Sequence, residues 1–210
     1  MPNKSYFSKV AIITLLTVIF AVAGCISCTS ERKNEHPSED MVVVFKTTEG
    51  DIEISLLPKN APKACENFLK WCEGIEIPGS DYRDSLYLGN NFYNVEPNLF
   101  IQTGDVFNQG KGAEMFEFEY EKTDVPAVVG SVFFVKDIES NTNNSIFAIL
   151  LRDNPKLEDV YTIFGRVTDG LDICYKISNV PTTKDEALGI KVPNKDIKIN
   201  SVTIKNAKEE

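Results

Sequence analysis

The stretch that decides the fold runs GNNFYNVEPNLFIQTGD, from Gly89 to Asp105. It holds two short apolar runs, Phe92–Val95 and Leu99–Gln102, and each of them predicts a β-strand of a few residues. Further short strands are predicted downstream, at Ser131–Val135, Ser145–Leu150, Tyr161–Val167 and Ile197–Ile204. Many short strands of this kind, with helices set apart from them, favour an antiparallel barrel whose ends are capped.

Upstream of this stretch the sequence predicts a β-hairpin followed by a helix. Met41–Phe45 is an apolar run rich in β-formers, and residues 52–56 alternate apolar and polar side chains, which is typical of a half-buried strand. Pro62 stands near the start of a helical pattern, where its missing N–H costs nothing, and Gly74 ends that pattern. A second, shorter helix is expected at Leu171–Ile177.

Composition and charge exclude several classes of function. The chain has 210 residues, a formal net charge of −9 and a single histidine, His36, in a polar stretch before any core pattern begins. An acidic chain is a poor ligand for nucleic acid, because phosphate backbones require a basic surface. With one histidine, a serine or cysteine nucleophile system and a histidine-bound zinc are both disfavoured. We therefore expect no metal and no cofactor.

The cysteines do not form a metal-binding or redox pattern. Cys65 and Cys72 lie on the inward face of the predicted helix, two turns apart and too far from each other to form a disulfide, so both are interpreted as core residues. Cys25 and Cys28 have C-x-x-C spacing without the βαβ context of a redox site. The state of Cys174 is left open by the sequence.

The first 24 residues have the character of an export signal. Lys4 and Lys9 precede the apolar run Val10–Ala23, which is shorter than the ~20 residues that a comfortable transmembrane helix needs. The run ends in VAGC, at residues 22–25, which resembles the lipobox of bacterial lipoproteins. That resemblance implies that Cys25 is acylated and becomes the first residue of the mature protein. The alternative is an uncleaved membrane anchor with an incidental cysteine.

These features divide the chain into three parts. Residues 1–24 are predicted to be a lipoprotein signal peptide, residues 25–40 a lipidated flexible tether, and residues 41–206 the one folded domain. The expected location is the cell envelope, with the domain facing the periplasm or the cell surface. Ile26 lacks the aspartate that marks inner-membrane retention in some lipoproteins, which favours an outer membrane.

Four stretches of the predicted domain carry a family resemblance. They are TEGDI with APKACENF at 48–52 and 61–68, the stretch 89–105, NTNNSIF at 141–147, and TIFGRV with GLD at 162–167 and 170–172. In order and approximate spacing they resemble the motifs of cyclophilins, the peptidyl-prolyl cis-trans isomerases. The resemblance implies a mostly β fold, an eight-stranded antiparallel barrel capped by two helices, and isomerisation of X-Pro bonds without metal, cofactor or covalent nucleophile. The alternative is an unrelated barrel such as a lipocalin, and it would require all four ordered matches to be accidental.

The same resemblance implies where the active site lies and how it has changed. Asn94 stands where the family has its catalytic arginine, while Gln102 of the same motif is kept. Asparagine is short and neutral, and it cannot offer the guanidinium fork. The residues that the resemblance places in the peptide-binding cleft are Phe92, Leu99, Phe100, Ile146, Ala148, Leu157 and Tyr161. Arg83, Arg152 or Lys156 could supply a replacement cation from a loop.

Two hypotheses follow from this pattern. The first is a monomeric envelope isomerase of reduced activity that acts on X-Pro segments of exported polypeptides, which fold where proline isomerisation is slow. The second is a catalytically inactive module with the same fold that binds a proline-containing peptide or protein partner. If the cleft is otherwise competent, Asn94→Arg should raise the activity, and no gain would indicate that the cleft itself has been lost.

Overall fold

The β1–β2 hairpin opens the folded part of the chain, at Met41–Thr47 and Asp51–Leu56. The computed structural model describes residues 41–76, 84–106 and 114–206. The predicted signal peptide, the tether, Cys25, Cys28 and Arg83 lie outside these residues. Between the two strands, the Thr47 hydroxyl accepts hydrogen bonds from the N–H groups of Glu49 and Gly50, which closes the turn that the sequence indicated.

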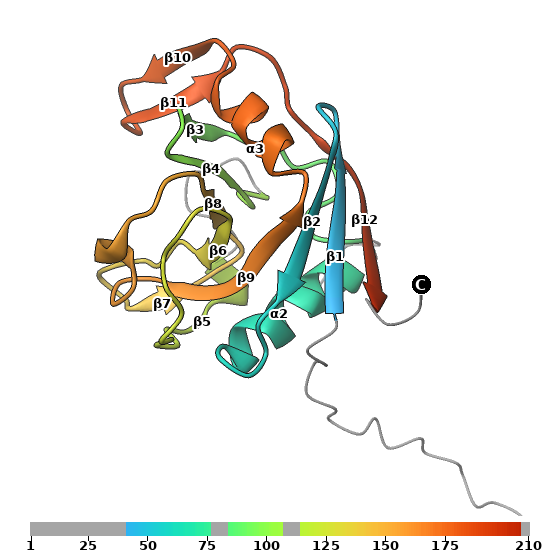
Figure 1. Ribbon diagram of the computed structural model, residues 1–210, viewed down its shortest axis with the longest axis vertical. Helices are drawn as coiled ribbons and strands as arrows, with labels where there is room; N and C mark the ends of the chain where they lie inside the picture. The colour runs from blue at the N-terminus through green and yellow to red at the C-terminus, as the bar shows by residue number, and fades with distance from the viewer. Residues whose placement is uncertain (1–40, 77–83, 107–113, 207–210) are drawn as a thin grey trace, which may run out of the picture. The chain divides into compact units, whose positions relative to one another are not determined.

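Eight strands form one antiparallel sheet in the order β12-β1-β2-β9-β6-β8-β4-β3 (Figure 1). The other six are β3 (Asn94–Glu96), β4 (Phe100–Thr103), β6 (Ser131–Phe134), β8 (Phe147–Leu150), β9 (Thr162–Asp169) and β12 (Ile199–Asn206). The sheet curls, so that the β1–β2–β12 part lies opposite the β4–β8 part. This confirms the mostly β, cyclophilin-like sheet, and its strands begin or end within a few residues of the predicted ranges.

The two edges of the curled sheet are joined by the chain segments that precede β3 and β12. Asn91 forms a β-bridge with Lys198, and the Phe92 N–H donates to the Ile197 carbonyl at 2.9 Å. The Ile199 N–H donates to the Asn90 carbonyl at 2.9 Å. The sheet therefore closes on itself through a short irregular seam instead of through a ladder between β3 and β12.

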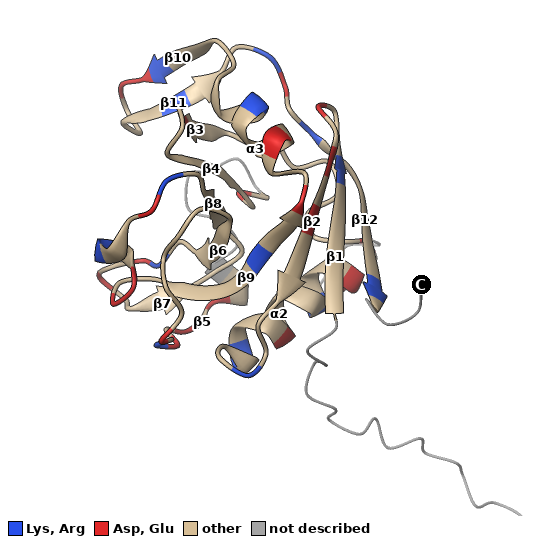
Figure 2. Cartoon of the chain, in the orientation of Figure 1, with Lys and Arg blue, Asp and Glu red and all other residues tan. Residues whose placement is uncertain are grey.

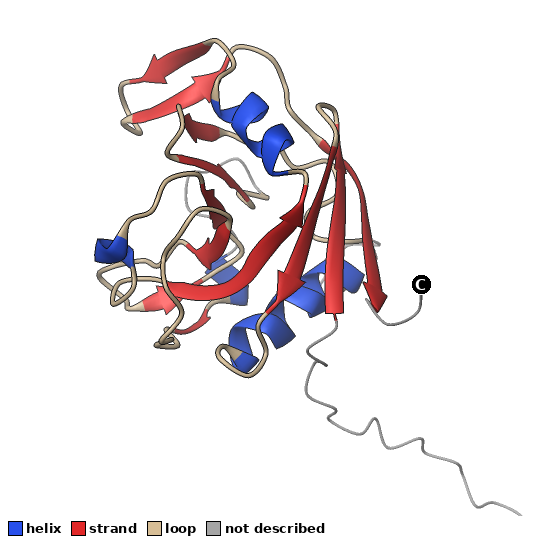
Figure 3. Ribbon diagram, viewed as in Figure 1, coloured by secondary structure: helices blue, strands red, loops and turns tan. Residues whose placement is uncertain are grey.

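Two α-helices lie at opposite ends of the sheet (Figure 3). The first, α2 (Pro62–Glu73), packs against β9 and β12, and the second, α3 (Leu171–Ser178), packs against β2, β3 and β4. As predicted, α2 begins at Pro62, and Gly74 follows its last residue as the C-cap. No side chain at its N-cap residue, Ala61, satisfies the first turn. The carboxylate of Glu121 does so instead, accepting the Lys63 and Ala64 N–H groups at 3.4 and 3.0 Å.

Four short strands and two 3₁₀ turns were not predicted. β5 (Phe118–Glu119) pairs with β7 (Thr142–Asn143), and β10 (Thr182–Asp185) pairs with β11 (Ile190–Pro193). The 3₁₀ turns are η1 (Glu114–Phe116) and η2 (Pro155–Leu157). Strands of two residues carry too little alternation to be recognised, and the β10–β11 strands are only partly buried, so neither hairpin has a strong period-2 signal.

Aromatic side chains fill the inside of the sheet. Phe68 of α2 points into it, and its ring lies 4.7 Å from that of Phe164 and 5.3 Å from that of Phe147. Phe134 stacks on Phe164 at 4.3 Å. Cys65, Cys72 and Cys174 are buried free thiols of this core, which confirms the core assignment of the first two.

Two of the family-like motifs, the stretch 89–105 and NTNNSIF at 141–147, contact each other at Gly104. A Cβ atom at this position, where φ is +96°, would lie 2.2 Å from the Ser145 carbonyl oxygen, so only glycine fits. The Ser145 hydroxyl donates to the Gly104 carbonyl at 2.7 Å, and the Tyr87 hydroxyl donates to the Ser145 carbonyl at 3.1 Å. This contact joins the ends of β4 and β8 and thereby sets the surface that these two strands present outside the sheet.

Candidate active site

A groove of about 160 Å³ lies on the outer face of the sheet, over β4, β6 and β8. Six of the nine residues predicted for the site line it, namely Leu99, Phe100, Gln102, Ala148, Leu157 and Tyr161. Four further residues line it that sequence reasoning missed, namely Phe133, Val135, Leu150 and Asn154. Residues spread over 62 positions of the sequence, from Leu99 to Tyr161, therefore share one hollow.

Strand alternation explains which side chains form the floor of the groove. In β6, Val132 and Phe134 point into the core, whereas Phe133 points outward. In β8, Phe147 and Ile149 point inward, whereas Ala148 and Leu150 point outward. Phe133 and Leu150 were missed because the family motifs, and not the alternation of these strands, served to select the cleft residues. The period-2 rule applied to β6 and β8 was the available signal.

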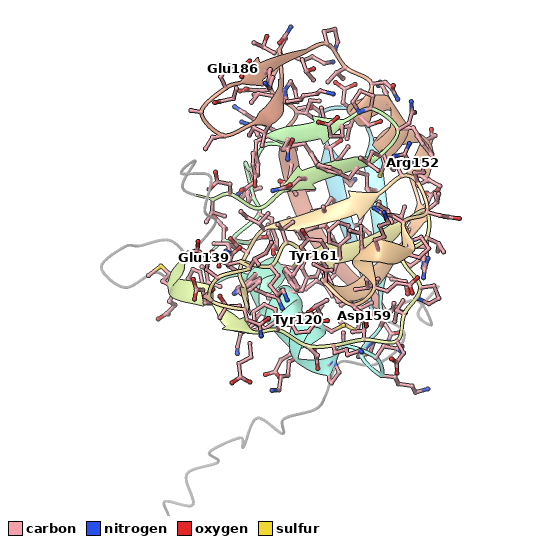
Figure 4. The ribbon with its side chains drawn as sticks, turned by 90° about the vertical axis from the view of Figure 1, so that its left-hand side faces the viewer. Tyr120, Glu139, Arg152, Asp159, Tyr161 and Glu186 are labelled. Carbon is pink, nitrogen blue, oxygen red and sulfur yellow. The ribbon has the colours of Figure 1, made fainter. Side chains whose placement is uncertain are left out.

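The far wall of the groove comes from the segment 151–161 that joins β8 to β9. Leu157 and Tyr161 extend from it, and the Tyr161 ring packs at 5.2 Å on Phe133 (Figure 4). The segment is tied to the body of the protein by the Asn154 N–H, which donates to the Ala127 carbonyl at 2.9 Å. The Glu158 carboxylate accepts the Ala127 N–H at 3.1 Å. The wall is thus fixed to the main chain of Ala127 by two hydrogen bonds, one from the Asn154 N–H and one to the Glu158 carboxylate.

The polar end of the groove is a chain of side-chain amides. Gln102, directly opposite Asn94 in the β3–β4 ladder, accepts a hydrogen bond from the Asn94 Nδ2 at 3.0 Å through its Oε1. The Gln102 Nε2 donates to the Tyr93 hydroxyl at 2.6 Å. Burial raises the pKa of Tyr93, so its phenol stays protonated at neutral pH. Both hydrogen-bonding ends of Gln102 are therefore held in place before any ligand arrives.

Three of the predicted site residues lie outside the groove lining. Phe92 is 2% exposed and belongs to the aromatic core, because the chain there turns inward to form the seam with Ile197. Ile146 is 5% exposed and precedes β8, where its N–H donates to the Asn144 side chain in a turn. Asn94 is 7% exposed beneath β11 and contacts the groove only through Gln102. The motif positions of Phe92 and Ile146 suggest cleft residues, and the structure places both side chains outside the groove lining.

The groove has no acid, amine or imidazole among its lining residues. Its floor strands β4, β6 and β8 carry no charged residue, and the charges gather on the surrounding loops (Figure 2). Arg152 and Lys156, the predicted replacement cations, are exposed on the segment 151–161 and do not line the groove. Among the described residues, the polar side chains that line the groove are two amides and a phenol, from Gln102, Asn154 and Tyr161.

Metal and thiol chemistry find no support among the described residues. Across 41–76, 84–106 and 114–206, no three histidine, cysteine, aspartate or glutamate side chains gather in a way that could hold a metal ion. Burial raises the pKa of the Cys65 and Cys174 thiols to about 12, which leaves them protonated and unreactive. In the same ranges, no helix has the length and apolar character needed to cross a membrane.

Comparison with known proteins places this arrangement in one family. The profile described as cyclophilin type peptidyl-prolyl cis-trans isomerase/CLD matches residues 42–204. Peptidyl-prolyl cis-trans isomerase-like 3 of Gallus gallus is 33% identical over 169 residues, which cover 78% of this chain and 96% of the relative. Peptidyl-prolyl cis-trans isomerase CYP71 of Arabidopsis thaliana is also 33% identical, over 170 residues, and the chain spans only 24% of that longer protein.

One solved structure matches this fold over nearly the whole length of the solved chain. The cyclophilin type peptidyl-prolyl cis-trans isomerase of Cryptosporidium parvum, crystallised in the presence of the dipeptide Ala-Pro, superposes with a TM-score of 0.66 at 27% identity. The match covers 79% of this chain and 99% of that structure. The chain spans about a quarter of the longer curated relatives, 24% of CYP71 of Arabidopsis thaliana and 27% of peptidylprolyl isomerase domain and WD repeat-containing protein 1 of Mus musculus.

Proposed function

The chain belongs to the cyclophilin-type peptidyl-prolyl cis-trans isomerase family, and we propose that it acts, with slow turnover, on X-Pro segments of exported polypeptides in the cell envelope. The observation that carries this proposal is the apolar groove that ends at an anchored amide, Gln102. A cavity of about 150 Å³ is sufficient to hold a benzene molecule. The groove, at about 160 Å³, is therefore large enough to accommodate a pyrrolidine ring.

This geometry suits the requirements of prolyl isomerisation. The barrier to rotation is ~18–20 kcal/mol and comes from resonance of the C–N bond. An enzyme lowers it by favouring the twisted state, in which the prolyl nitrogen becomes pyramidal and can accept a hydrogen bond. Leu99, Phe133 and Leu157 would hold the proline ring, and the Gln102 amide would supply a donor at the polar end. No step needs a metal or a nucleophile.

Slow turnover follows from the character of that donor. A carboxamide is neutral, and hydrogen bonds to charged groups are roughly twice as strong as those between neutral groups. The groove lining has no guanidinium or ammonium group, so the twisted state would gain less than in a site that carries an arginine. We therefore expect the missing arginine to leave the peptide Kd largely unchanged and to lower the rate of isomerisation.

A protease-coupled isomerisation assay on an Ala-Pro tetrapeptide tests the proposal. The wild-type chain should exceed the uncatalysed rate, and Leu157→Ala should reduce that excess about five- to ten-fold, because it removes apolar contact worth on the order of 1 kcal/mol. Leu188→Ala is the matched control, since Leu188 is 53% exposed on the β10–β11 turn, away from the groove. A wild-type rate equal to background would exclude isomerase activity toward this peptide.

The second candidate function is an inactive module that binds a proline-containing partner. The burial of Asn94 favours it, because the residue at the family's arginine position does not reach the groove directly. Isothermal titration with the same tetrapeptide separates the two candidates, since a binder gives a measurable Kd without rate enhancement. Asn94→Arg then tests whether the groove can still support catalysis. A folded variant with a higher isomerisation rate would show that it can, and a folded variant without activity would show that it cannot.

The place of action rests on Cys25 and is tested separately. We propose that Cys25 carries the lipid anchor of a monomeric domain in the envelope, with an outer membrane favoured by Ile26. Labelled palmitate should be incorporated into the wild-type chain and not into Cys25→Ala. Cys28→Ala is the control, because its thiol lies only three positions away. Equal labelling of Cys25→Ala would place the acyl chain elsewhere.

A further inference from the structure

The amide chain at the polar end of the groove continues into a distant part of the protein. The main-chain N–H of Lys191, in β11, donates to the Asn94 Oδ1 at 3.4 Å. The Lys191 ammonium pairs with Glu96 of β3 at 2.7 Å, which holds β11 against this strand. Lys191, Asn94, Gln102 and Tyr93 therefore form a continuous chain of hydrogen bonds, from the β10–β11 hairpin to the groove.

The direction of this chain is determined by its first member. A main-chain N–H can only donate, so the Asn94 oxygen must face Lys191 and the Asn94 nitrogen must face Gln102. The Asn94 nitrogen in turn requires an acceptor, which places the Gln102 oxygen toward β3. The Gln102 nitrogen is then left on the side of the Tyr93 hydroxyl. A carboxamide alone could adopt either of two orientations, and here one is selected.

We infer that Asn94 is a positioning residue that sets the polarity of the Gln102 carboxamide, and that Tyr93 holds the resulting orientation by accepting from Nε2. Gln102 then offers its remaining Nε2 hydrogen on the Tyr93 side and its remaining Oε1 lone pair on the Asn94 side. This inference rests on the proposed function, since it assigns these groups to a bound X-Pro segment. It also gives Asn94 a role other than that of the arginine it replaces. The residue orients the donor and does not itself touch the substrate.

The same arrangement links the β10–β11 hairpin to the site. Lys191 is 97 positions from Asn94 in the sequence, yet its N–H determines which face of Gln102 donates. Lys191 takes part through its main chain, so of the four groups only the Tyr93 phenol can titrate, and burial raises its pKa further above neutrality. The polarity of the groove should therefore not change with pH across the neutral range.

Asn94→Asp tests the inference by reversing the polarity at constant shape. A carboxylate has no hydrogen to donate, so it would accept from both the Lys191 N–H and the Gln102 nitrogen, which turns the Gln102 amide over. The Tyr93 hydroxyl could then donate to the Gln102 oxygen, and all partners would stay satisfied. Asn98→Asp is the matched control, because Asn98 is exposed on the β3–β4 turn and outside the chain of hydrogen bonds.

The readout is the pair of Gln102 side-chain amide resonances in a ¹⁵N–¹H spectrum of the full-length protein, together with the Kd of the Ala-Pro tetrapeptide. We expect Asn94→Asp to shift both Gln102 resonances and to raise the Kd of the peptide about five-fold or more. Asn98→Asp should change neither the resonances nor the Kd. Unmoved resonances and an unchanged Kd in folded Asn94→Asp would overturn the inference. If the wild-type protein binds no peptide, the proposed function fails, and the resonances still decide the polarity.

Tyr93→Phe provides the second test, in case Asn94→Asp does not fold. It removes the acceptor of the Gln102 nitrogen and keeps the ring, so the exchange of that amide with solvent should accelerate. Tyr175→Phe is the control, because it also loses one hydroxyl hydrogen bond, to the Leu151 carbonyl at 2.8 Å, outside the groove. Equal exchange at Gln102 in Tyr93→Phe and Tyr175→Phe would contradict a positioning role for Tyr93.

Discussion

The core of the sheet and the groove on its outer face are built from alternate residues of the same strands. Phe134 and Phe147 point inward from β6 and β8, and their neighbours Phe133 and Ala148 point outward. Both sides are apolar. The inner side is covered by Phe68 of α2, whose ring contacts five other aromatic rings. On the outer side no element covers the strands in the same way. The segment 151–161 lines only one side of this face, so the groove stays open. What distinguishes a binding site from a core here is the covering layer.

The two regions also differ in how their polar groups are satisfied. In the core, the Tyr87 hydroxyl donates to the Ser145 carbonyl, and this bond joins two chain segments. At the groove, the Gln102 amide is held by Asn94 and Tyr93 and keeps hydrogen-bonding capacity for a ligand. Substitutions inside the sheet should therefore change stability, whereas substitutions in the groove should change peptide affinity.

The largest effect on stability is expected for Phe68→Ala. This change removes the ring at the centre of the aromatic cluster, and a Phe→Ala cavity in a core costs about 3–5 kcal/mol. Urea unfolding followed by circular dichroism measures the loss. The peptide Kd of the folded fraction should stay unchanged, and a weaker Kd would show that the core and the groove are not separable.

A sharper form of the comparison uses two adjacent phenylalanines. Phe134→Leu should cost about 1–3 kcal/mol, because Phe134 stacks on Phe164 at 4.3 Å and each aromatic pair adds about 0.5–1.5 kcal/mol beyond burial. Phe133→Leu should lower the free energy of unfolding by less than about 1.5 kcal/mol, and it should instead raise the Kd of the Ala-Pro tetrapeptide. Each variant is the control of the other, measured by urea unfolding and calorimetric titration. The same ranking in both measurements would contradict the separation.

Acid should separate the two regions as well. The hydrogen bonds from Lys195 and Lys176 lower the pKa of Glu49 at the β1–β2 turn, so this group stabilises the fold above the ordinary carboxyl range and loses that contribution as the pH falls through its folded pKa. Glu49→Gln should lower Tm by about 2–4 °C at neutral pH and by progressively less as the pH falls through the folded pKa of Glu49. Thermal unfolding across this pH range measures this.

Peptide affinity is the control for that experiment. The groove lining contains no group that titrates near neutrality, so the Kd should be constant between about pH 5 and 8 in the wild-type chain and in Glu49→Gln alike. A Kd that followed the pH over this range would point to a titrating group that acts on the groove from outside its lining.

The smallest effect is expected at the edge of the groove wall. The Tyr120 hydroxyl donates to the Asp159 carbonyl at 3.2 Å, beside the salt bridge between Lys122 and Asp159 (Figure 4). This hydrogen bond is exposed to solvent, so Tyr120→Phe should change the free energy of unfolding by less than about 0.5 kcal/mol. The Kd should not change, because the segment 151–161 is also held through Ala127. A clear loss of affinity would show that Tyr120 positions the wall.

The eight strands of the main sheet, the extent of α2 and six of the ten groove-lining residues could be predicted from the sequence. Alternation and motif spacing depend on residues close together in the chain, so β1, β2, β6, β8 and β9 and the pairing of Leu99 with Gln102 in one site could be predicted. The missed floor residues, Phe133 and Leu150, were within reach of the same alternation. The lipid anchor and the site of export stay predictions from residues 1–40.

Only the tertiary structure decided which polar groups act together. Glu121 caps a helix 57 positions before it, the seam between residues 89–92 and 197–199 buries Phe92, and Lys191 orients Asn94 across 97 positions. Such contacts have no period in the sequence, because the two partners meet only after the intervening chain has folded. The family motifs therefore indicated a cleft and most of its residues, and long-range packing determined which hydrogen-bonding face its glutamine presents.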